Sequence, residues 1–120
     1  MRVLVADDES HIVNVVALKL RGAGYEVDTA ADGAEALQKA IHNAPDLLLT
    51  DYNMPRMNGV ELCTELCKRK VWRAPALLLT ARESEFSAET LRRINIVEVI
   101  NKPFSPRQLL ATVQQHLAAA

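Results

Sequence analysis

The sequence predicts a single α/β domain built on a five-stranded parallel sheet with helices packed against it. Five short apolar runs alternate with segments whose apolar residues recur at helical spacing. Strands buried between layers of helices are typically continuous apolar runs of this kind. In addition, 120 residues are enough to bury a core, and no linker or repeat divides residues 1–120, so we expect one domain.

The first half of the chain contains three of the predicted strands. Val3–Val5 is the first, and the helix after it has an apolar stripe at i, i+3, i+4 and i+7, formed by Val13, Val16, Ala17 and Leu20. A second strand at about residues 26–30 precedes Asp32 and Glu35, which predict a helix start because the aspartate can cap it and the glutamate can reach back. Leu47–Thr50 is the third strand.

The next predicted elements are a helix, a strand and a second helix with fewer apolar residues. The first of these helices follows a loop containing Pro55, and its inward residues are Gly59, Leu62, Cys63 and Leu66. Ala76–Leu79 forms the fourth strand. The helix at about residues 84–94 has only a thin apolar stripe, formed by Ala88, Leu91 and Ile94. Such a stripe predicts loose docking and mobility. Asn95 is predicted to end this helix in a left-handed conformation.

The last strand and helix complete five strand–helix pairs. Val97–Ile100 is the fifth apolar run. Ser105 and Pro106 predict the start of the final helix, because serine is a preferred cap and proline suits the first helical position. The residues predicted to face inward are Leu110, Val113 and Leu117.

Composition excludes several classes of function. The net charge of -1 leaves no basic surface for nucleic acid. The amino terminus reaches Asp7 before a secretory or membrane-spanning segment can form. We therefore expect a cytoplasmic protein that binds neither nucleic acid nor membranes. Cys63 and Cys67 are interpreted as small core residues.

Polar side chains stand at the ends of four of the apolar runs. Asp7 and Asp8 follow the first run, Asp51 follows the third and Lys102 follows the fifth. Thr80 closes the fourth run. Ligands of parallel α/β sheets bind outside the carboxyl ends of the strands, so we expect these side chains to converge on one site.

Three converging carboxylates require a positive partner. Two like charges about 4 Å apart repel by roughly 4 kcal/mol at an effective dielectric near 20. Oxygen ligands with open positions suit Mg²⁺, which is commonly held by one or two carboxylates, waters and a phosphate. The alternative is three acids fanned apart at a solvated edge, without a metal.

Asp51 is the best candidate nucleophile, since a carboxylate beside a divalent ion can accept a phosphoryl group. Lys102 and Thr80 could then neutralise or hydrogen-bond two phosphoryl oxygens, while the metal covers the third. Asp46 begins the same strand and lies about 16 Å away at ~3.3 Å per residue, so it is assigned to the opposite edge and to no chemistry.

These residues fall in a recognisable pattern. Its parts are Asp7-Asp8, the stretch 46–55 with Gly59, Leu79-Thr80-Ala81 and Lys102-Pro103-Phe104. Over the whole chain the pattern closely resembles the receiver domain of the response regulators of bacterial two-component systems, the chemotaxis regulators among them. The resemblance implies a flavodoxin-like, doubly wound sheet of strand order 2-1-3-4-5 with five helices.

The resemblance also implies roles for individual residues. Mg²⁺ would be held by Asp8, Asp51 and the Asn53 carbonyl, with Asp7 acting through water. Thr80 would drive the switch, and the Lys102–Pro103 peptide would be cis. One departure is that the family usually has Tyr or Phe three residues before the lysine, where this chain has Val99. A rotating aromatic therefore cannot report the movement of Thr80.

Partners follow from the same resemblance. The expected donor is a sensor histidine kinase or a histidine phosphotransfer protein, and the output is a downstream effector protein or domain, with a phosphorylation-dependent homodimer as one form of output. His11 is predicted to be a solvated residue near the donor surface rather than a catalytic base. Asn53 and Arg82 are expected to flank the path of the water that removes the phosphoryl group.

Two other functions share parts of this pattern. A phosphatase of the haloacid dehalogenase type would use Asp51 as nucleophile, but it needs a second aspartate two residues later, where this chain has Asn53. A flavin-binding flavodoxin would need phosphate-binding donors after the first strand, where Asp8 and Glu9 stand. We therefore expect a phosphoacceptor signalling domain, not an enzyme that turns over a separate substrate.

Overall fold

A computed structural model describes residues 1–69, 72–81 and 86–118. Its parallel sheet has the order β2-β1-β3-β4-β5. The strands are β1 (Arg2–Ala6), β2 (Glu26–Ala30), β3 (Leu47–Asp51), β4 (Ala76–Thr80) and β5 (Ile96–Asn101). The helices are α1 (Ser10–Gly22), α2 (Gly33–His42), α3 (Gly59–Cys67), α4 (Ala88–Arg93) and α5 (Pro106–Ala118). The predicted fold class and strand order are confirmed.

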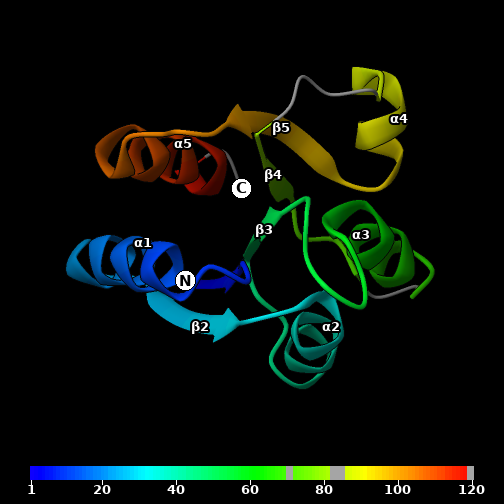
Figure 1. Ribbon diagram of the computed structural model, residues 1–120, viewed down its shortest axis with the longest axis horizontal. Helices are drawn as coiled ribbons and strands as arrows, with labels where there is room; N and C mark the ends of the chain where they lie inside the picture. The colour runs from blue at the N-terminus through cyan, green and yellow to red at the C-terminus, as the bar shows by residue number, and fades with distance from the viewer. Residues whose placement is uncertain (70–71, 82–85, 119–120) are drawn as a thin grey trace.

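Helices cover both faces of the sheet, which explains the continuous apolar runs. In Figure 1, α1 and α5 lie on one side, and α2, α3 and α4 lie on the other. Successive residues of β3 point to opposite layers: Leu47 and Leu49 pack with α1 and α5, whereas Leu48 packs with the other layer. All residues of β3 and β4 are buried. Their first polar side chains therefore come at the carboxyl ends.

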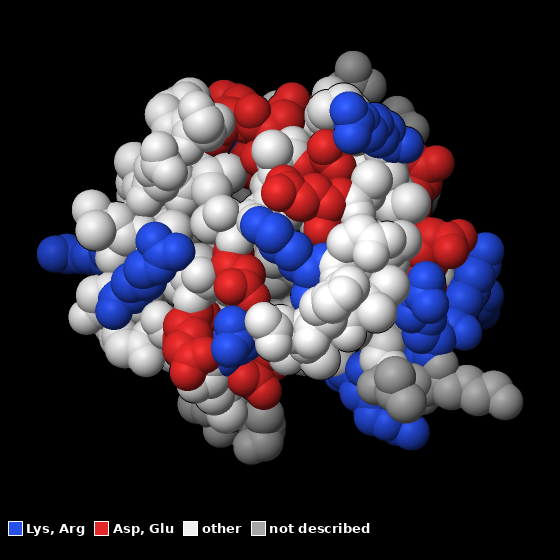
Figure 2. All heavy atoms as spheres, turned by 90° about the horizontal axis from the view of Figure 1, so that it is seen from below, with Lys and Arg blue, Asp and Glu red and all other residues white. Residues whose placement is uncertain are grey.

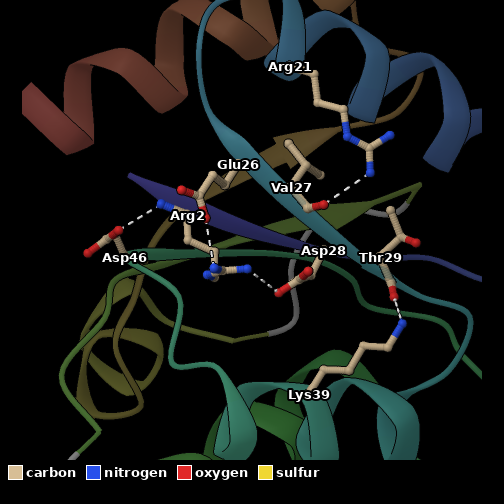
Figure 3. A network of polar contacts seen from close by, with 8 residues as sticks. All are labelled: Arg2, Arg21, Glu26, Val27, Asp28, Thr29, Lys39 and Asp46. Atoms are coloured by element: carbon tan, nitrogen blue, oxygen red, sulfur yellow. Dashed lines mark hydrogen bonds and ion pairs between the residues drawn. The ribbon is translucent and has the colours of Figure 1, made fainter.

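The edge strand β2 is held by cations from both helical layers (Figure 3). Its residues Val27 and Thr29 have their backbone groups directed away from β1, because Glu26 and Ala30 make the bonds to that side. Arg21 of α1 donates to the Val27 carbonyl at 3.0 Å, and Lys39 of α2 donates to the Thr29 carbonyl. Charged side chains of this kind protect an open sheet edge from pairing with another strand.

At the amino-terminal ends of the strands, Arg2 joins three segments (Figure 3). Its guanidinium contacts Glu26 at 2.7 Å and Asp28 at 3.0 Å, and its backbone amide donates to the Asp46 carboxylate at 2.7 Å. Asp46 thus lies at the amino-terminal end of β3, opposite to Asp51, as predicted. The hydrogen bond from the Arg2 amide gives Asp46 a structural role at this end of the sheet.

Acidic and basic side chains are interspersed on the face seen from the side of β2 and α2 (Figure 2). This mixture agrees with the net charge of -1. None of the helices in the described residues is long and apolar enough to cross a membrane.

One helix differs from its predicted form at a single position. In α5, Val113 and Leu117 are buried as predicted, but Leu109 is buried in place of Leu110, which is only partly buried. Consecutive helical residues are about 100° apart, so the buried stripe begins one position earlier than predicted.

Within the described residues, α4 begins at Ala88 and buries only Leu91, which confirms its thin stripe. The predicted start at residue 84 lies outside those residues. Asn95 has the predicted left-handed conformation, with φ 63°.

Candidate phosphoacceptor site

The carboxyl edge of the sheet brings the predicted acids together. Asp7 and Asp8 follow β1, and Asp51 is the last residue of β3. Oxygen atoms of the three carboxylates lie within 4.8 Å of one another. Asp7 and Asp51 are buried and Asp8 is exposed. Three oxygen donors this close, one of them open to solvent, fit a hard divalent cation such as Mg²⁺.

Lys102 provides the positive charge of the site. Its ammonium lies 3.1 Å from Asp7 Oδ2 and 3.3 Å from Asp51 Oδ2. A third carboxylate, that of Glu9, lies 3.4 Å away. The backbone places this lysine directly, because the Lys102 amide donates to the carbonyl of Thr80 at 2.8 Å. The Lys102–Pro103 peptide is cis, as predicted.

Burial and charge shift the protonation of both central groups. The pKa of Asp51 is raised to about 6, first by burial and then by the negative charge of Asp7, against the opposing charge and hydrogen bond of Lys102. Burial alone would lower the pKa of Lys102, but its hydrogen bond to Asp7 and the charges of Asp51 and Asp7 outweigh burial and raise the pKa. The single ammonium of Lys102 therefore does not fully offset the burial and the negative charge around Asp51, while Lys102 itself stays protonated.

A small cavity opens above Asp51. Its volume is about 240 Å³, and it is lined by Asp8, Glu9, Asp51, Tyr52, Asn53, Thr80, Ala81 and Lys102. Thr80 is buried at the end of β4, and Asn53 is exposed two residues after Asp51. Most of the predicted site residues therefore face one space, large enough for a phosphoryl group and its water.

The loop after Asp51 is held by close backbone packing. The Tyr52 amide donates to the Leu79 carbonyl at 2.7 Å, and the Gly59 amide donates to the Tyr52 carbonyl at 2.9 Å. A Cβ atom on Gly59 would lie 2.5 Å from the Asp51 carbonyl oxygen. Only glycine allows α3 to start this close to the backbone of Asp51.

Two features of the site were missed in the sequence. One is the capping box of α3, in which Asn58 accepts from the Glu61 amide and Glu61 accepts from the Asn58 amide. Its signal was readable, because an asparagine followed three residues later by a glutamate is a known helix-start pattern. The other is Glu9, for which the sequence carried no signal of a contact with Lys102.

The structure also places most of the other residues that the sequence singled out. His11 is exposed and lines a neighbouring groove of about 490 Å³, together with Ile12, Val15, Phe104 and Pro106. Val99 is partly buried and packs against the core on the α2–α4 side. Arg82, which was expected to affect hydrolysis, lies outside the described residues. Cys63 is buried as expected, and Cys67 is partly buried.

Comparison with known proteins identifies the family. A family model described as the response regulator receiver domain matches residues 3–114. The chain belongs to this family. Receiver domains are signalling modules of two-component systems, so the phosphatase and flavodoxin alternatives are not favoured.

Individual relatives agree with this assignment. The chain is 40% identical over 113 residues to the alkaline phosphatase synthesis transcriptional regulatory protein PhoP of Bacillus subtilis, covering 94% of this chain and 47% of that protein. It thus spans about half the length of this curated relative. Among solved structures, the Vibrio cholerae chemotaxis protein CheY4 has a TM-score of 0.87 and 37% identity, covering 96% of this chain and 97% of that one. A CheY-like receiver domain protein of Methanospirillum hungatei has a TM-score of 0.89 and 29% identity, with 98% and 94% covered.

Proposed function

We propose that residues 1–120 form one receiver domain that accepts a phosphoryl group on Asp51. The observation that carries the proposal is the position of Asp51. The residue is 4% exposed, its carboxylate shares Lys102 with Asp7, and it lines the cavity that also contains Thr80. A buried carboxylate next to a cation and a hydroxyl is arranged to take up phosphoryl charge.

The divalent ion in this proposal is Mg²⁺. Asp8, Asp51 and the Asn53 carbonyl would hold it, with Asp7 acting through water. The proximity of the three carboxylates, within 4.8 Å, supports this set. When bound, the ion would neutralise charge on the acceptor and the phosphoryl oxygens.

The transfer step follows from these positions. An Oδ atom of Asp51 forms a bond to phosphorus while the phosphorus–nitrogen bond of a phosphohistidine donor breaks. The electron pair stays on the imidazole nitrogen, which leaves as a neutral ring if the other nitrogen carries the proton. Lys102 and Thr80 each donate to a phosphoryl oxygen. Slow hydrolysis of the acyl phosphate past Asn53 then resets the domain.

The donor is proposed to be a histidine kinase or a histidine phosphotransfer protein. The groove lined by Ile12, Val15, Phe104 and Pro106 supports this, because it adjoins Lys102 and offers an apolar surface beside the acceptor. The output would be a downstream effector protein or domain, or a homodimer that forms on phosphorylation, acting in the cytoplasm.

The switch is proposed to run from Thr80 to α4. With Val99 in place of an aromatic, another route is needed, and Tyr52 offers one. Its ring meets that of Phe86, just before α4, edge to face with centroids 6.1 Å apart. Movement at the acceptor can therefore reach the weakly packed α4 through these two rings. Phe86→Ala should reduce the change in hydrogen exchange at α4 on phosphorylation.

Phosphate labelling tests the acceptor. Intact-protein mass spectrometry after incubation with acetyl phosphate and Mg²⁺ should show one added phosphoryl group on the parent domain. Asp51→Asn should abolish the label, and Asp8→Ala should weaken metal binding sharply. Asp46→Asn is the matched control, since it makes the same chemical change at the other end of β3. Full labelling of Asp51→Asn would remove Asp51 as the acceptor.

A further inference from the structure

Glu9 stands where a helix cap is expected but does not act as one. It is the N-cap residue of α1, and its side chain makes no capping hydrogen bond within the described part of the chain. By contrast, Asp32, Asn58 and Ser87 each accept a helix amide at the starts of α2, α3 and α4. A side-chain cap stabilises a helix by about 0.5–2 kcal/mol. The side chain of Glu9 is instead directed elsewhere.

The partner of Glu9 is Lys102. Glu9 Oε1 lies 3.4 Å from the ammonium, beside Asp7 Oδ2 at 3.1 Å and Asp51 Oδ2 at 3.3 Å. An ammonium has three N–H donors, and three carboxylates stand around it. An incoming phosphoryl oxygen that binds Lys102 before the bond to Asp51 forms must therefore displace one of these carboxylates.

The three carboxylates are not equally easy to displace. The side chains of Asp7 and Asp51 are 0% and 6% exposed, whereas that of Glu9 is 49% exposed. Water can replace Lys102 as a partner for Glu9 at little cost, but a buried carboxylate that loses its cation is strongly destabilised. Glu9 is also outside the proposed metal ligands and lines the acceptor cavity.

We propose that Glu9 is a positioning residue, the exchangeable third partner of Lys102. It holds the ammonium in the unphosphorylated domain and gives up its place when a phosphoryl oxygen arrives. This rests on the proposed function, in which Asp51 is the acceptor. Because the contact between Glu9 and Lys102 must break before Asp51 is phosphorylated, Glu9 slows the phosphorylation.

The test compares initial rates of phosphorylation by acetyl phosphate at saturating Mg²⁺, followed by intact-protein mass spectrometry. Glu9→Gln should be phosphorylated about threefold faster than the parent, the size expected for a partly exposed ion pair. The matched control is Glu65→Gln, which removes a carboxylate of α3 that pairs with Lys68 at 3.1 Å. Its rate should not change.

Glu9→Asp separates the contact from the general effect of charge. Aspartate keeps the negative charge but is one methylene too short to reach Lys102, and it is a good N-cap. We expect Glu9→Asp to be phosphorylated faster than the parent and to melt at a higher temperature, a combination that a purely structural role of Glu9 would not produce.

Several results would overturn the inference. They are an unchanged or slower rate for Glu9→Gln, an equal acceleration in Glu65→Gln, or a parental rate for Glu9→Asp. Failure of the proposed function is distinct, because the parent domain itself would then gain no phosphoryl group or Asp51→Asn would still gain one.

Discussion

Asp51 should reduce the stability of the folded domain at neutral pH. Its pKa is raised from 3.8 to about 6, first by burial and then by the charge of Asp7, against the opposing effect of Lys102. A carboxyl group with a raised pKa binds its proton more tightly in the folded than in the unfolded chain. The stability it contributes is therefore present below pH 4 and is lost as the pH rises through 6.

The size of the effect follows from the shift. The difference between 6 and 3.8 is about 2 pKa units. At about 1.4 kcal/mol per unit, charging Asp51 costs the folded domain up to about 3 kcal/mol at pH 8. Asp51→Asn removes the charge with little change in shape, so this variant should be more stable than the parent by about 1–3 kcal/mol at that pH.

Urea unfolding between pH 8 and pH 4, without divalent ions, measures the difference in free energy of unfolding between the parent and Asp51→Asn. It should be largest at pH 8 and should shrink below pH 6. Adding Mg²⁺ should stabilise the parent more than the variant, since a ligand that binds only the folded state stabilises it. Asp46→Asn is the control and should gain no stability, because Asp46 is exposed and accepts from the Arg2 amide. A stability difference between the parent and Asp51→Asn that is absent at pH 8, or equal at every pH, would refute the reasoning.

Three further results are expected. Gly59→Ala should destabilise the domain by roughly 1–3 kcal/mol in urea unfolding, because its Cβ would lie 2.5 Å from the Asp51 carbonyl oxygen, whereas Gly22→Ala, with nothing within 4 Å, should not. Asn58→Ala should cost about 1 kcal/mol by the same measurement through loss of the α3 capping box, and an unchanged midpoint would contradict this. Beryllium fluoride with Mg²⁺, as a phosphoryl mimic, should change hydrogen exchange more in α4 than in α1; equal changes would argue against a switch through α4.

The convergence of the site could be predicted because it depends on topology. In a parallel sheet every strand that ends in a polar residue delivers it to the same edge, so the positions of Asp7, Asp51, Thr80 and Lys102 followed once the apolar runs were recognised as strands. The same argument placed Asp46 at the opposite end, where it contacts Arg2.

What could not be predicted depends on side-chain direction. Glu9 is exposed and follows two acids, and nothing in its neighbours shows that it turns toward a lysine 93 positions later. Whether Leu109 or Leu110 is buried depends on the rotation of α5 against the sheet, which is set by packing with α1. The apolar pattern of α5 allows either rotation.

The hydrogen bonds that Arg21 and Lys39 donate to β2 affect how the domain unfolds locally. An edge strand pairs with one neighbour only and would ordinarily be the first part of a sheet to fray. Here Arg21 and Lys39 attach β2 to α1 and α2, which lie in different layers. Detaching the strand therefore disturbs both layers together. Amide protons of β2 should then exchange with solvent mainly through unfolding of the whole domain, and the sheet should keep its full width for as long as the domain remains folded.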